Sequence, residues 1–155
     1  MSTAPLLNSQ ILGQAHYAAR ALLERELART GNTFFHSIAL NALAAQGGAA
    51  AREAIAERMT STVKIDEGEA LKALVELADS GLVETVPSSS APGDADRIQL
   101  TEDGRALQTR LAAFAAEVAP RVYGTVPEED LAVAARVLLQ ITERANAVCA
   151  ETADR

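Results

Sequence analysis

From Ala70 to Glu84 the chain reads ALKALVELADSGLVE, and from Arg97 to Leu111 it reads RIQLTEDGRALQTRL. The apolar residues of the first stretch recur three and four positions apart as far as Gly81, which is the spacing of an amphipathic helix. Gly81 suits the left-handed residue that ends a helix, and after it the apolar spacing changes to two, the period of a strand. Together the stretches predict a helix, a β-hairpin and a further helix, in that order.

Cap and stop residues divide the chain before this hairpin into four predicted helices. Their expected bounds are Asn8 or Ser9 to Gly31, Asn32 or Thr33 to Gly47, about residues 50–62, and Asp66 to Gly81. Asp66 and Glu69 have the spacing of a capping box, in which each residue's side chain binds the other's backbone N–H. The turn-forming residues 87–96 should make a mobile hairpin tip.

The segment after the hairpin predicts two more helices. Thr101 should cap the fifth helix, Pro120 should bend or end it, and Pro127 should open the sixth. The first and last helices carry apolar stripes longer than a small core can cover. A dimer in which they pair across a twofold axis would bury those stripes.

This order of elements predicts a mainly α fold with a small antiparallel β-hairpin: a winged helix-turn-helix with N- and C-terminal dimerisation helices. Residues 1–155 should form a single domain. Within it, 33–100 should be the winged-helix lobe, and 8–30 and 102–150 the dimerisation helices. A plain helical bundle with a surface hairpin is the alternative.

Composition excludes several classes of protein. No apolar run is long enough for a membrane span, and no signal-like block precedes the first helix, so we expect a cytoplasmic protein. One cysteine, Cys149, excludes an internal disulfide and a Cys-based metal cluster. A net charge of −7 argues against nonspecific nucleic-acid binding. With no phosphate loop or nucleophile elbow, the sequence predicts no catalytic residue and no cofactor.

The two quoted stretches resemble the MarR family of bacterial transcription regulators. In that family a helix ending in Leu-x-x-x-Gly-Leu-Val is the recognition helix, and Leu-Thr-x-x-Gly joins the return strand of the wing to a long dimerisation helix. The matching residues here are Leu77, Gly81, Leu82, Val83, Leu100, Thr101 and Gly104. The resemblance implies a homodimeric, DNA-binding regulator, a ligand-responsive repressor, that reads a pseudo-palindromic operator in double-stranded DNA and is released by a small-molecule effector.

The resemblance also implies where DNA would be contacted. Candidates on the recognition helix, the helix before it and the wing are Arg58, Ser61, Lys64, Glu69, Lys72, Ser89 and Arg97. This region is acidic for a DNA reader: residues 66–84 hold six carboxylates and one basic residue, Lys72. Carboxylates accept hydrogen bonds from cytosine N4 but repel phosphate. The alternative is that these charged side chains form an ordinary solvated surface with no role in DNA binding.

Effectors of the family bind between the DNA-binding lobe and the dimerisation helices. The matching candidates here are His16, Tyr17, Arg20, His36 and Asn41, although each could equally be an ordinary helix side chain. Arg20 suits an anionic group, and either histidine could make binding pH-dependent. Two histidines without a third ligand predict no metal site. Cys149 could pair across a dimer, but an inert thiol is the more common case.

Two other functions stay open at this point. A winged-helix protein can cease to bind DNA and act through a small-molecule ligand or a protein partner. The cavity can also be repurposed as an enzyme site, with His16, Tyr17 or His36 as acid or base. A continuous basic strip on the recognition face would favour DNA.

Overall fold

The computed structural model describes residues 5–87 and 96–153, in six helices and three strands. The elements are α1 (Ser9–Ala28), α2 (Phe34–Ala45), β1 (Ala49–Ala51), α3 (Arg52–Val63), α4 (Glu67–Asp79), β2 (Val83–Val86), β3 (Arg97–Leu100), α5 (Glu102–Tyr123) and α6 (Glu128–Ala153). They fall into two compact units, which divide inside α5 between Ala115 and Ala116. No helix within the described ranges is long and apolar enough to cross a membrane.

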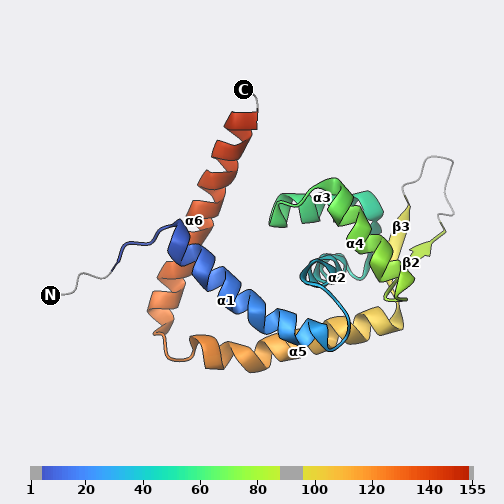
Figure 1. Cartoon of the computed structure of the whole chain (residues 1–155), viewed down its shortest axis with the longest axis horizontal. Helices are drawn as coiled ribbons and strands as arrows, with labels where there is room; N and C mark the ends of the chain where they lie inside the picture. The colour runs from blue at the N-terminus through green and yellow to red at the C-terminus, as the bar shows by residue number, and fades with distance from the viewer. Residues whose placement is uncertain (1–4, 88–95, 154–155) are drawn as a thin grey trace. The chain divides into compact units, whose positions relative to one another are not determined.

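The first unit contains the predicted winged helix. Helices α2, α3 and α4 pack against one another, and the small sheet lies at the end of α4 (Figure 1). The large apolar side chains that are fully buried at the centre come from α1 to α4: Leu27, Leu40, Leu43, Ile55, Met59 and Leu77. Burial of these large aliphatic groups stabilises the arrangement, since each contributes about 1.5–3 kcal/mol.

The sheet has three strands rather than the two of the predicted hairpin. Its order is β1-β3-β2, and both pairings are antiparallel, with Ile98 of β3 opposite Ala50 on one side and Thr85 on the other. The sequence missed β1 because its three residues are alanines, which favour helix and give no alternating pattern. For the same reason α3 begins at Arg52, slightly later than expected.

The helix ends follow the predicted signals. Gly81 has a φ of 71°, its N–H donates to Ala78, and the N–H of Leu82 donates to the carbonyl of Leu77 over 2.9 Å. These two bonds are the Schellman motif. Because they turn the chain directly from α4 into β2, they set the position of the recognition helix relative to the wing.

The capping box lies on a different helix from the one predicted. The Asp66 carboxylate accepts from the Glu69 N–H over 2.8 Å, but no return bond from Glu69 occurs among the described residues. The reciprocal pair forms instead at the start of α2, between Thr33 and His36. The usual sequence signature of a capping box requires Glu or Gln at the third helical position, so it overlooks a histidine.

Thr101 and Pro127 act where predicted, whereas Pro120 does not end its helix. Thr101 caps α5 by accepting from the Gly104 N–H over 3.1 Å. The helix continues past Pro120 and ends at Tyr123, and α6 begins directly after Pro127. In the second unit α6 has no buried residue along its length, so its apolar face is uncovered within that unit.

Candidate nucleic-acid interface

Helix α4, the predicted recognition helix, is anchored by one apolar face. Ala70, Ala73, Leu74 and Leu77 are all buried against the core of the first unit. Residues 68, 72, 75 and 79 follow one another at four, three and four positions, and therefore share the opposite, solvent-facing side. There the Lys72 side chain is 74% exposed and Val75 is 50% exposed.

Asp79 shares this outward side, whereas the other carboxylates of α4 lie on its flanks. Glu69 and Glu76, seven residues apart, face a cleft shared with α1 and the start of α2. Glu67 faces the groove towards α3, which also contains Glu53 and Glu57. The predicted DNA contact Glu69 is exposed, but it lies beside the outward face and not at its centre.

Three other predicted DNA contacts lie at the end of α3. Arg58, Ser61 and Lys64 are all exposed, and the Ser61 hydroxyl donates to the Arg58 carbonyl over 3.0 Å. Lys64 is the C-cap residue of α3 and has a φ of 58°. It is the one non-glycine residue with positive φ among those described. This left-handed conformation directs the turn that joins α3 to α4.

The wing contributes Arg97. This residue is exposed at the start of β3, where it pairs with Ala51 and Val86, and the next residue, Ile98, is buried. The alternation confirms that the Arg97 side chain faces solvent. The predicted contact Ser89 lies outside the described residues.

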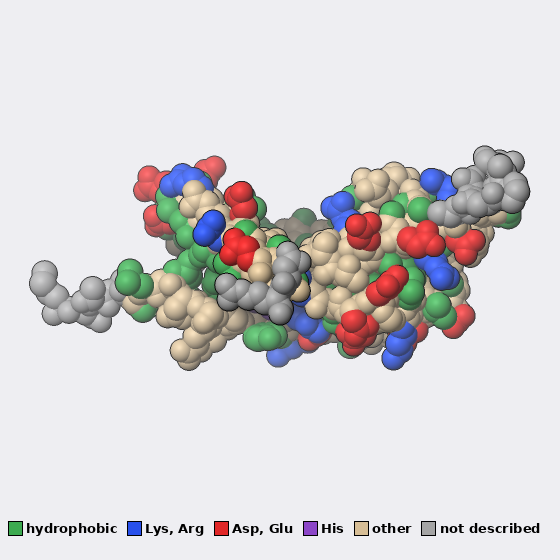
Figure 2. All heavy atoms as spheres, turned by 90° about the horizontal axis from the view of Figure 1, so that it is seen from above, with side chains coloured by type: hydrophobic (Ala, Val, Ile, Leu, Met, Phe, Trp, Pro, Cys, Tyr) green, Lys and Arg blue, Asp and Glu red, His purple; other side chains and the backbone are tan. Residues whose placement is uncertain are grey.

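The surface charge over this region is mixed. Figure 2 shows one face of the protein, on which carboxylates lie between the basic side chains of the part that holds α3 and α4. The continuous basic strip that would mark a strongly charged DNA footprint is not seen on that face. Contact with DNA would therefore depend on a few basic groups placed at the right points.

A cleft of about 500 Å³ lies between α1, the start of α2 and α4. Its lining residues combine two aromatic rings with charged and polar groups: Arg20, Glu24, Asn32, Thr33, Phe34, Phe35, Glu69, Lys72, Ala73 and Glu76. The Arg20 guanidinium carbon lies 4.2 Å from the centre of the Phe34 ring, while its Nε contacts Glu24 over 2.7 Å. Such a volume with aromatic walls suits a small organic ligand.

Of the five predicted ligand residues, Arg20 alone lines this cleft. His16 and Tyr17 are exposed on α1, although the His16 ring comes within 6.3 Å of the Phe34 ring. Asn41 is exposed on α2. Sequence reasoning missed Phe34 and Phe35, because apolar residues at helical spacing are read as core.

His36 is buried, and its ring makes hydrogen bonds that support the fold. Its Nδ1 accepts from the Thr33 N–H over 3.2 Å, so its Nε2 carries the proton and donates to Glu76 over 2.9 Å. The imidazole thus joins the start of α2 to the middle of α4. Both of its nitrogens are engaged within the protein, and the ligand contact predicted for His36 stays a prediction.

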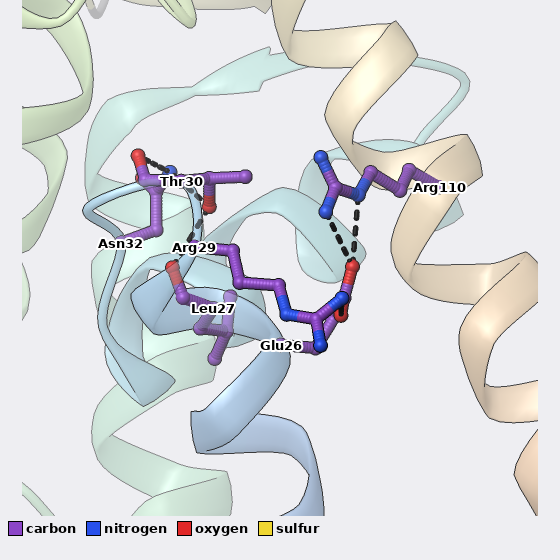
Figure 3. A network of polar contacts seen from close by, with 6 residues as sticks. All are labelled: Glu26, Leu27, Arg29, Thr30, Asn32 and Arg110. Carbon is purple, nitrogen blue, oxygen red and sulfur yellow. Dashed lines mark hydrogen bonds and ion pairs between the residues drawn. The ribbon is translucent and has the colours of Figure 1, made fainter.

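A second buried polar contact joins α1 to α5 (Figure 3). Both Nε and Nη2 of Arg110 donate to the same Glu26 oxygen, over 2.8 and 2.6 Å, and Arg29 lies 3.5 Å from the other oxygen. Glu26 is almost fully buried, so Arg110 balances a charge that would otherwise be costly. The two residues are 84 positions apart, and no local sequence signal links them.

Cys149, the one cysteine of the sequence, is exposed on α6. Across residues 5–87 and 96–153, no three His, Cys, Asp or Glu side chains come together in a way that could hold a metal ion.

Comparison with known proteins identifies the fold. No protein-family model and no curated protein matches the sequence. Solved structures do match: transcriptional regulator PA3341 has a TM-score of 0.74 at 25% identity, covering 89% of this chain and 97% of that one. The PcaV transcriptional regulator from Streptomyces coelicolor, solved with its natural ligand, has a TM-score of 0.70 at 21% identity, covering 94% of this chain and 99% of its own.

A mutant MarR from E. coli, solved in complex with operator DNA, has a TM-score of 0.70 at 16% identity and covers 85% of this chain and 91% of its own. The neighbours are MarR-type transcriptional regulators. The winged helix-turn-helix fold expected from the two quoted stretches is therefore confirmed.

Proposed function

We propose that this chain, which has the MarR-type winged-helix fold, is a DNA-binding transcriptional regulator and not an enzyme. The observation that carries the proposal is the outward side of α4, where Lys72 is exposed while the opposite side is anchored in the core. A helix presented in this way fits the major groove of B-DNA. A regulator of this kind works in the cytoplasm, where the DNA is.

The chain would act as a homodimer, with residues 33–100 as the DNA-binding lobe and 8–30 and 102–150 as dimerisation helices. Two copies of α4 about one helical turn apart would read a pseudo-palindromic operator. Arg58, Ser61 and Lys64 on α3 and Arg97 on the wing are placed to contact phosphates on either side of that groove. We propose repression as the outcome, because a dimer on a promoter obstructs polymerase.

The cleft beside α4 is the proposed effector site. Arg20 can bind a carboxylate through two hydrogen bonds, the N-terminus of α2 favours an anion, and the Phe34 and Phe35 rings offer an apolar surface. The proposed effector is therefore a small aromatic carboxylate. Because Glu69, Lys72 and Glu76 of α4 line the same cleft, its binding would disturb the helix that reads DNA.

The first prediction tests the DNA contacts. A duplex enriched from a random pool by the full-length protein serves as the operator, and affinity is measured over a salt series. The double variant Lys72→Ala/Arg97→Ala should bind it more weakly by about 1–3 kcal/mol for each of the two side chains that touches a base. For each that touches a phosphate, the salt slope should be smaller by about one. Arg136→Ala on α6 removes one positive charge from the second unit and controls for the loss of a single charge.

The same assay tests the proposed effector. Benzoate should release the parent protein from the duplex, benzylamine should not, and Arg20→Ala should be insensitive to benzoate. If the double variant is folded and binds like the parent, the recognition assignment is wrong. If the parent enriches no sequence at all, the alternative of a winged-helix protein acting through a protein partner takes its place.

A further inference from the structure

Val75 is an apolar residue in an unusual place. It is 50% exposed, whereas the other large apolar residues of α4 are buried or half-buried. Between residues 18 and 87, no other large hydrophobic side chain is exposed among those described. An exposed β-branched side chain on a helix contributes nothing to the core and reduces helix propensity slightly, so the fold does not require a valine here.

The neighbours of Val75 place it on the side of α4 that faces away from the core. Lys72 precedes it by three residues and Gly68 by seven, so all three lie along one line of the helix. Gly68 has no side chain, and the helix backbone at that turn is therefore open to close approach. Along the line lie one basic group, Lys72, whose Nζ is 3.8 Å from a Glu76 oxygen, and one apolar surface, Val75, followed four residues later by Asp79 at the end of the helix. Glu69 and Glu76 line the cleft to one side of this line.

This combination matches one feature of the major groove. Every thymine presents a 5-methyl group there, and small apolar side chains recognise it by direct contact. Cytosine lacks that methyl, so the contact distinguishes T·A from C·G. Among the acidic side chains of α4 that could accept from cytosine N4, Asp79 shares the line, one turn beyond Val75, and the others lie off it.

Resting on the DNA-binding function proposed above, we infer that Val75 is a specificity-determining residue that contacts a thymine 5-methyl group in each half-site of the operator. Lys72 positions the helix on the phosphate backbone, and Val75, one turn further along, discriminates the base. Sequence preference then comes from an apolar contact, which the acidic character of α4 does not weaken.

The test removes the methyl group and nothing else. In the duplex enriched by the full-length protein, each thymine is replaced in turn by deoxyuridine, and affinity is measured. One thymine in each half-site should be sensitive, with binding about fourfold weaker once the methyl is removed. Val75→Ala should bind the thymine and deoxyuridine duplexes equally, whereas Val75→Thr, which keeps one methyl, should retain part of the difference.

Two controls separate this contact from the rest of the interface. Lys72→Ala should bind both duplexes more weakly while keeping the thymine preference, and the salt slope of Val75→Ala should equal that of the parent. Circular dichroism melting confirms that the variants are folded, which the exposure of Val75 leads us to expect.

Each of the following results would overturn either the inference about Val75 or the proposed function. A parent protein that binds its duplex but tolerates deoxyuridine at every position overturns the inference and leaves DNA binding intact. So does a thymine preference that survives in Val75→Ala. A parent that enriches no duplex overturns the proposed function, and this inference with it.

Discussion

At the scale of single residues, Lys64 combines backbone strain with a functional position. Its φ of 58° is a conformation that costs a residue with a Cβ about 1–2 kcal/mol, and glycine much less. A lysine is kept there although glycine would fit the turn better. A contact between its exposed ammonium group and a DNA phosphate would explain why a lysine occupies this corner between α3 and α4.

Two substitutions separate these effects. Lys64→Gly should raise the free energy of unfolding by about 0.5–1 kcal/mol, because it relieves the left-handed conformation. Lys64→Ala should leave the strain and give no such gain. Both should reduce the salt slope of DNA binding by about one if the ammonium contacts a phosphate. Urea unfolding and a salt series measure the two quantities, and equal stability of the glycine and alanine variants would contradict the argument.

Side-chain contacts between different helices could not be predicted from the sequence. The exposure of Lys72 and Arg97 followed from periodicity, because each alternates with core residues in its own element. The engagement of His36 with Thr33 and Glu76, and the pairing of Glu26 with Arg110, did not, since each depends on a residue from another helix. Pairings of this kind become visible only once the helices are packed.

At the scale of elements, the junction between the wing and α5 depends on Gly104. A Cβ at this position would collide with the backbone carbonyl oxygen of Leu82, and backbone cannot move aside as a side chain can. That carbonyl also accepts from the Thr101 N–H over 3.2 Å. The glycine of the Leu-Thr-x-x-Gly stretch is therefore required by close packing of α5 on the turn after α4.

The third prediction compares two glycines in helices. Gly104→Ala should lower the free energy of unfolding by about 1–3 kcal/mol, the usual cost of forcing extra volume into a packed site. Gly13→Ala in α1 meets only an ordinary contact, 3.9 Å from the Tyr17 ring, and should raise it by about 0.5–1 kcal/mol. Urea unfolding of both variants tests this, and the explanation fails if the two substitutions have the same sign.

Element prediction succeeded where the signals were local. The caps Asn8, Thr33 and Thr101 and the stop at Gly81 are chosen by neighbouring backbone groups, so the sequence carries them. Strand β1 was missed, because an alanine segment becomes a strand only through pairing with β3, nearly fifty residues away. Its Ala50 is buried in the sheet only after that pairing has formed.

At the scale of the whole molecule, the net charge disfavours binding to DNA, whereas an uncovered apolar stripe favours binding to a protein partner. A net charge of −7 repels DNA at long range, so binding must rely on close contacts from a few residues of the first unit. In the second unit α6 leaves a helical stripe uncovered, made of Val137, Ile141, Ala145 and Val148. Apolar stripes of this length are usually covered by a partner.

The last prediction follows from that stripe. We expect a second copy of the chain to cover it, since homodimers with twofold symmetry are the commonest assemblies and the same face is available on each copy. Ile141→Glu places a charge in the middle of the stripe and should convert the dimer to monomer or unfolded chain, because an unpaired buried carboxylate costs several kcal/mol. Light scattering after size-exclusion chromatography measures the mass directly.

Leu139→Glu is the matched control for this substitution. Leu139 is 71% exposed and lies on the opposite side of α6, three residues after Arg136 and four before Glu143, so a charge there joins other charges. This variant should keep the parent's mass and stability, although it introduces the same side chain two positions away. Two results would show that the stripe does not join two copies: a parent protein that is monomeric and stable at micromolar concentration, or an Ile141→Glu variant that stays dimeric. The expected spacing of two operator half-sites would then have no structural basis.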